Sequence, residues 1–194
     1  MKALARITTV LFLMGIAFVL GFLAVRSYGH ANAASPSADS SSSTALAALL
    51  AQHLVVVDKN GTFKPFDAAG LKGVKYFAFY HSASWCPPCK ILTPKLVKFY
   101  NSFKPQHPDF ELIFISHDDD APSQLDHMKA DAMPWPAVRY DDIDGLKLKD
   151  MDSSAGLPDL LLEDASGKVL SDTFPPLGSG DTNKVLDDIK RIVR

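Results

Sequence analysis

The stretch "YHSASWCPPCKILTPKL", residues 80–96, holds Cys86 and Cys89, the two cysteines of this 194-residue chain. It overlaps the end of "VKYFAFYHS", residues 74–82, a continuous apolar and aromatic run that predicts a buried strand. From residue 90 to 103, apolar side chains recur every three or four positions, which predicts an amphipathic helix. The cysteine pair is therefore expected in the turn between a central strand and a helix.

The rest of the chain predicts an α/β domain. The segment 54–66 places an Asn60-Gly61 turn between two apolar runs, which is typical of a β-hairpin. Because strands alternate with helices beyond it, we expect a central mixed β-sheet with helices on both faces and this hairpin as an N-terminal extension. The other expected elements are a helix over 45–54, a strand over 110–118, a helix over 122–132, an extended segment over 133–140, two strands within 157–173 and a helix over 181–194.

Charge and cysteine content narrow the possible functions. The net charge is −2 and the pI is near 6.3, which gives no support for nucleic-acid binding, since that usually needs a concentrated basic face. Two cysteines are too few for a disulfide scaffold or for a four-ligand structural zinc site. A mixed metal site with His81 or His117 is the open alternative; otherwise we expect no metal and no cofactor. The acidic run 117–123 is expected to be a solvated loop that caps the next helix rather than a cation site.

The first 34 residues predict an export segment. Lys2 and Arg6 precede an uncharged, mostly apolar run over 7–25, and Ala31-Asn32-Ala33 offers a cleavage site, as in a secretory signal peptide. The apolar run is also long enough to cross a bilayer, which takes about 20 residues, so an uncleaved signal anchor is the alternative.

The serine-rich residues 35–44 predict a flexible linker, and the folded domain is expected over 45–194. Because the positive charges precede the apolar run, both alternatives place this domain beyond the membrane. We therefore expect an exported protein, periplasmic or otherwise extracytoplasmic, that is either soluble or tethered by an N-terminal transmembrane segment.

The position of the cysteines predicts their chemistry. A cysteine at the start of a helix faces unpaired backbone N–H groups and the positive end of the helix dipole, which favour thiolate over thiol. Cys86 is therefore expected to be an exposed nucleophile, with Trp85 as an apolar wall beside it. Cys89 lies one helical turn later, where its sulfur can close a disulfide with Cys86. Pro87 suits the first helical turn, where a missing N–H costs nothing.

The residues around the pair resemble the thioredoxin superfamily, and most closely its tryparedoxin and nucleoredoxin branch. The resemblance is carried by "SASWCPPCK", "FELIFISHDDD", "MPWPAVRY" and "GLPDLLLEDASGKVL". It covers roughly residues 55–194 and is weakest over 140–154. It implies a thioredoxin-like fold in which Cys86 is the nucleophile and Cys89 the resolving cysteine.

The resemblance also implies substrate-binding roles for Trp85, Leu157, Pro158 and Trp135. Pro158 matches the family's cis-proline beside the cysteines, which would let the Leu157 backbone pair with an extended substrate. Trp135 is expected at the rim of the active site, with plain core packing as the alternative.

Two residues depart from the common family pattern. Tyr80 stands where many thioredoxins carry a buried acid, which leaves water, Tyr80 and Glu163 as candidate proton acceptors for Cys89. Asp159 follows the proline where threonine is common, and a carboxylate that pointed towards the sulfurs would oppose thiolate formation.

These observations predict an enzyme, a thioredoxin-like protein-disulfide oxidoreductase that forms a mixed disulfide at Cys86 and resolves it with Cys89. Its expected partners are protein or peptide disulfides and an upstream thiol reductant. The Pro-Pro pair lacks the histidine of strongly oxidising loops, which favours the reducing direction. The alternatives are a peptide-binding adaptor without turnover and a disulfide oxidase.

Overall fold

A computed structural model of the chain describes residues 46–148, 156–174 and 180–194. The predicted export segment of residues 1–34 and the predicted linker of residues 35–44 lie outside these ranges. Within the ranges that are described, none of the helices combines the length and the apolar character needed to span a bilayer.

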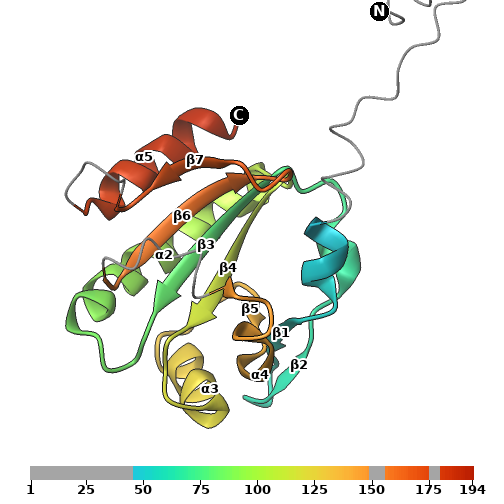
Figure 1. Ribbon diagram of the computed structural model, residues 1–194, viewed down its shortest axis with the longest axis vertical. Helices are drawn as coiled ribbons and strands as arrows, with labels where there is room; N and C mark the ends of the chain where they lie inside the picture. Colours follow the sequence, from blue (N-terminus) through green and yellow to red (C-terminus); the bar gives the residue numbers. More distant parts are fainter. Residues whose placement is uncertain (1–45, 149–155, 175–179) are drawn as a thin grey trace, which may run out of the picture. The chain divides into compact units, whose positions relative to one another are not determined.

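Seven strands form one mixed sheet in the order β2-β1-β5-β4-β3-β6-β7 (Figure 1). At its centre, β3 lies parallel to β4 and antiparallel to β6. The predicted N-terminal hairpin is present as β1 and β2, and it joins the sheet because β1 also pairs with β5. The strands are β1 (Leu54–Val57), β2 (Phe63–Pro65), β3 (Tyr76–Ser82), β4 (Phe110–Ser116), β5 (Ala137–Val138), β6 (Asp159–Asp164) and β7 (Val169–Asp172).

Helical elements cover both faces of this sheet, as the alternation of strands and helices predicts. In β3, Ala78 and Tyr80 belong to one apolar core with residues of α2 and α5. The alternate residues Phe77 and Phe79 belong to a second core with residues of η1, α4 and the helical residues 46–51. The helical elements are η1 (Ala68–Leu71), α2 (Pro87–Phe103), η2 (Lys104–Gln106), α3 (Ala121–Ala130), α4 (Tyr140–Ile143) and α5 (Thr182–Ile192).

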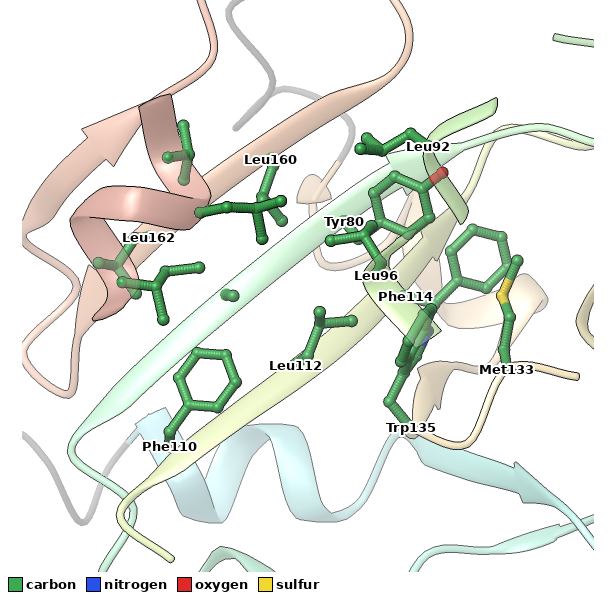
Figure 2. Packing of buried hydrophobic residues seen from close by; sticks show 14 of the residues in the cluster. Tyr80, Leu92, Leu96, Phe110, Leu112, Phe114, Met133, Trp135, Leu160 and Leu162 are labelled. Carbon is green, nitrogen blue, oxygen red and sulfur yellow. The ribbon is translucent and has the colours of Figure 1, made fainter. Parts of the chain in front are cut away.

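The core beneath α2 is rich in aromatic side chains (Figure 2). Tyr80 packs edge-on against Trp135, with ring centroids 6.3 Å apart, and also contacts Phe114. Leu92 and Leu96 of α2 cover this group from above the sheet. Such aromatic pairs add about 1 kcal/mol each beyond the area they bury, so this core fixes α2, and with it the cysteines, against β3.

The region between residues 133 and 148 differs most from the sequence expectation. The extended segment adds two residues to the sheet as β5, since Pro134 and Pro136 have no N–H to donate to a ladder. The Pro136 carbonyl instead accepts a hydrogen bond from Phe114 N–H at 2.9 Å.

A short helix, α4, follows β5, and the sequence analysis did not predict it. Asp141 and Asp142 lie in its first turn, where acidic side chains interact favourably with the helix dipole.

Candidate active site

Cys86 and Cys89 are joined by a disulfide at the start of α2, in the turn that the sequence predicts. Cys86 is the N-cap residue of α2 and has an extended backbone, with φ −86° and ψ 109°. Cys89 is part of the first helical turn, and the two Cα atoms lie 5.3 Å apart. The pair therefore sits where β3 ends and where the positive end of the α2 dipole begins.

The two prolines leave one nearby backbone donor for the Cys86 sulfur. Pro87 and Pro88 occupy the first two helical positions, and neither carries an N–H. The next N–H along the chain, that of Cys89, donates to Cys86 Sγ at 3.3 Å. When the disulfide is reduced, this donor and the helix dipole favour negative charge on Cys86.

The prediction of an exposed Cys86 is wrong for the disulfide-bonded protein. Cys86 is 3% exposed and Cys89 is fully buried, because Ala83 and Leu157 pack against the pair. Cys86 is still the more exposed of the two residues. Trp85, beside it, is 57% exposed and forms an apolar surface next to the nucleophile.

The Leu157-Pro158 bond is cis, as the family resemblance predicts, and it brings Leu157 against the cysteines. A groove of about 230 Å³ adjoins this bond on the side of α5. Ile91, which is 67% exposed, and Phe174 make part of its wall apolar. Residues from four elements or their flanks line the groove, among them Pro88, Ile91, Lys95, Pro158, Phe174 and Thr182.

Trp135 does not lie at the rim of the active site. Its side chain is 1% exposed and packs between Tyr80 and Tyr100 in the core below α2. The prediction that it contacts substrate is therefore wrong, and the alternative of core packing holds. A Met-Pro-Trp-Pro sequence does not reveal which way the indole points.

Asp159 is buried, and its side chain leaves the sheet on the face opposite α2. It pairs with His81 across the β3–β6 ladder, so the two side chains share a face. His81 Nδ1 lies 3.1 Å from His117 Nε2, and burial, with the charge of His117 as a smaller cause, lowers the pKa of His81 to about 3. Within the described ranges, no group of three or more His, Cys, Asp or Glu side chains is arranged to hold a metal ion.

Tyr80 is bound to the active-site helix by a chain of two hydrogen bonds. The Thr93 hydroxyl donates to the Cys89 carbonyl at 2.9 Å, so its oxygen accepts the Tyr80 hydroxyl, also at 2.9 Å. Burial raises the pKa of Tyr80. The phenol is thus neutral at physiological pH and is a donor rather than a base.

Glu163 is too far from the cysteines to take their proton. It pairs with Phe77, near the start of β3, whereas Asp159, next to Pro158, pairs with His81 near the end of β3. Glu163 lies four residue steps along the strand from Asp159, about 13 Å. Burial raises the pKa of Glu163 to about 7, with Asp164 as a smaller cause, but its distance removes it from the candidate acceptors for the Cys89 proton.

Asp118 is a site residue that the sequence analysis missed. It is 3% exposed, so the prediction that residues 117–123 form a solvated loop is wrong at this position, whereas Asp120 caps α3 as predicted. Asp118 Oδ1 accepts a hydrogen bond from the Ser84 N–H at 2.6 Å. Burial alone would raise the pKa of Asp118, but hydrogen bonds from His127, Ser84 and Ser116 outweigh it and lower this pKa to about 2.

A sequence signal for Asp118 does exist. It is the last residue of the buried strand predicted over 110–118, and the cysteine loop follows another predicted strand. The carboxyl ends of parallel neighbouring strands meet at one edge of a sheet, so the pairing of β3 with β4 is enough to bring Asp118 to the loop.

Both the sequence and the structure of this chain are similar to those of known thioredoxin-like proteins. A family model described as thioredoxin-like matches residues 73–169, half of the chain. The nucleoredoxin of Danio rerio is 36% identical over 106 residues, which cover 54% of this chain and 25% of that protein. Probable nucleoredoxin 1 of Arabidopsis thaliana is 35% identical over 99 residues, 50% of this chain and 17% of that protein. The match thus spans a quarter or less of the length of these two relatives.

Solved structures with similar folds include a tryparedoxin and a thioredoxin. Tryparedoxin II from C. fasciculata is 30% identical with a TM-score of 0.52, and the match covers 64% of this chain and 82% of that one. A thioredoxin from Wuchereria bancrofti is 27% identical with a TM-score of 0.54, over 74% of this chain and 97% of that one.

We expect Tyr80→Phe to weaken the fold without changing the proton chemistry of the cysteines. The variant loses one buried hydrogen bond, which should lower the free energy of unfolding by about 1 kcal/mol in urea titrations. The Thr93 bond to Cys89 stays in place. The pH profile of disulfide reduction by dithiothreitol, followed by tryptophan fluorescence, should therefore match that of the wild type.

Thr93→Val is the matched comparison, because it removes the bonds to both Tyr80 and Cys89. Its unfolding free energy should fall further than that of Tyr80→Phe. A displaced pH profile in Tyr80→Phe would show instead that the phenol takes part in proton transfer with Cys89.

Proposed function

Because the chain belongs to the thioredoxin-like family, in its nucleoredoxin and tryparedoxin branch, we propose that it is a protein-disulfide oxidoreductase that acts through Cys86 and Cys89. One observation carries the proposal: the two cysteines form a disulfide at the N-terminus of α2, beside a cis-proline. The two cysteines are three residues apart, one at the N-cap and one in the first turn of the same helix.

The proposed reaction balances two electrons and two protons. The Cys86 thiolate attacks one sulfur of a substrate disulfide, which forms a mixed disulfide and releases the other substrate sulfur as a thiolate that gains a proton. Cys89, after losing its proton to water, attacks the Cys86 sulfur. The Cys86–Cys89 disulfide closes and the second substrate thiol leaves, so that the substrate is reduced and the protein oxidised. An upstream thiol reductant then regenerates the dithiol.

The surroundings of the pair support an extended protein segment as the substrate. Leu157 lies against the cysteines and precedes β6, which supports a role for its backbone in pairing with an extended chain. The groove beside Pro158 would take an apolar side chain close to the substrate disulfide. Trp85, which is exposed next to Cys86 in the chain, would offer a further apolar surface to the substrate.

We propose the reducing direction and an extracytoplasmic location. Two prolines separate the cysteines, without the histidine of strongly oxidising loops. The charged start and apolar run of residues 1–34 support export, with either a cleaved signal peptide or a retained anchor.

Cell fractionation with mass analysis of the mature N-terminus tests the location. The expected result is protein beyond the cytoplasmic membrane, either cleaved after Ala33 or intact and membrane-bound. Intact protein recovered in the cytosol would refute export.

Single cysteine variants test the mechanism. Cys86→Ser should abolish dithiothreitol-dependent insulin reduction, because it removes the nucleophile. Cys89→Ser should retain the first attack and accumulate a mixed disulfide with insulin, visible on non-reducing gels, because it cannot resolve it. The wild type should turn over without such an adduct.

Other outcomes point to other functions. Full turnover by Cys86→Ser would overturn the mechanism. A wild type that binds peptides but does not reduce insulin would indicate an adaptor, and a wild type that oxidises reduced substrate dithiols rather than reducing insulin would indicate an oxidase.

Ile91→Asp tests the groove. Placing a charge on its apolar wall should lower kcat/KM for insulin several-fold, equivalent to about 1 kcal/mol of lost apolar contact. Reduction of the variant by dithiothreitol should be unchanged, because that small reagent does not need the groove.

Leu49→Asp is the matched control. Leu49 is 48% exposed and lies in the helical residues 46–51, which pack on the opposite face of the sheet. The groove assignment fails if both aspartate variants lower kcat/KM equally.

A further inference from the structure

The loop between β3 and α2 sets the position of the nucleophile through few contacts. Its residues 83–85 lead directly to Cys86. The Ser82 carbonyl accepts from His117 N–H at 2.9 Å, and Cys86 N–H donates to the Ala83 carbonyl at 3.1 Å. Between these, the Ser84 N–H donates to Asp118 Oδ1 at 2.6 Å. This contact ties the middle of the loop to the segment that follows β4.

Asp118 is itself held firmly. Its Oδ2 accepts the Ser116 hydroxyl at 2.8 Å and lies 3.0 Å from His127 Nδ1. Its own backbone N–H donates to Ser116 Oγ at 3.1 Å, and its carbonyl accepts from the Tyr140 hydroxyl at 3.0 Å. The side chain of Asp118 is fully buried, and that of His127 is 3% exposed. The carboxylate is thus fixed in position and direction.

The same network reaches α3. The other ring nitrogen of His127, Nε2, lies 3.3 Å from Asp131 Oδ2. Because Asp118 is ionised, its Oδ2 accepts, and Nδ1 of His127 carries the donated hydrogen. A chain of polar contacts therefore runs from α3 through His127 and Asp118 to the backbone of the active-site loop.

We propose that Asp118 is a positioning residue, which holds the Ser84 backbone and thereby aims Cys86 at a substrate disulfide. The catalytic part of this inference rests on the proposed function; the anchoring of the loop does not. The negative charge of Asp118 by itself disfavours a thiolate in the adjoining loop. Its contribution to reaction is therefore geometric, through the carboxylate oxygen that receives the Ser84 N–H.

Two variants separate geometry from charge. Asp118→Asn removes the charge but keeps an oxygen for Ser84, and its amide nitrogen can donate to Ser116 Oγ or His127 Nδ1. Asp118→Glu keeps the charge but moves the carboxylate by one methylene. Asp120→Asn is the control: it makes the same chemical change two residues away, at the cap of α3, where asparagine serves as well as aspartate.

Ser84 amide exchange and insulin reduction are the two readouts. In Asp118→Glu, the Ser84 amide should exchange with solvent at least about tenfold faster, and kcat/KM should fall about tenfold or more, because small displacements of a reacting group are costly. Asp118→Asn should lose less than Asp118→Glu in both, because it keeps an oxygen for the Ser84 N–H, and Asp120→Asn should stay close to the wild type in both. Circular dichroism and thermal unfolding establish that each variant is folded; if Asp118→Glu is not, Asp118→Ala replaces it with the same expected losses.

The opposite pattern would overturn the proposal. If Asp118→Asn lowers kcat/KM for insulin while Asp118→Glu reduces insulin like the wild type, the charge of Asp118 rather than its position determines the activity. Unchanged Ser84 exchange in a folded Asp118→Glu or Asp118→Ala would refute the anchor directly. A wild type that cannot reduce insulin would refute the proposed function instead, and the exchange of Ser84 would still decide whether Asp118 anchors the loop.

Discussion

The parallel pairing of β3 with β4 is the constraint on which the site depends. The register runs from Tyr76 opposite Phe110 to Ser82 opposite Ser116, so both strands end at the same edge of the sheet. The loop that leads to Cys86 therefore emerges beside the loop that holds Asp118, and a backbone N–H meets a buried carboxylate there. This register therefore gives the active-site loop its contact with Asp118.

The antiparallel neighbour β6 completes the site from the other side. Because β6 runs against β3, its first residues lie at the edge where β3 ends, and the cis Leu157-Pro158 bond just before it arrives at the cysteines. The same geometry sends Glu163 to the far end of the strand, where its buried carboxyl cannot serve the sulfurs. The sheet thus brings Leu157 to the cysteines, which are about 70 positions away in the sequence. It also keeps Glu163, one of the predicted proton acceptors, away from them.

Apolar packing and polar contacts have different roles around the cysteines: packing holds the helix α2, and a hydrogen bond stabilises the Cys86 sulfur. Leu92, Leu96 and the aromatic core with Tyr80 hold α2 on the sheet. Within that helix, two prolines without N–H groups leave the Cys89 N–H directed at Cys86 Sγ. The packing fixes where the helix begins, and the first turn fixes how the sulfur is stabilised.

The sequence by itself determined the α/β class, the N-terminal hairpin, the cysteine turn and the cis-proline. Those features follow from local patterns, namely apolar periodicity, Asn-Gly and Cys-Pro-Pro-Cys, and from a family resemblance carried by short motifs. The tertiary structure alone decided that Trp135 is core, that Tyr80 donates to Thr93, that α4 forms and that Asp118 is buried against Ser84. The reason is physical: each depends on which strands are neighbours and in what register, and a side chain's direction relative to a distant segment is not encoded in its local pattern.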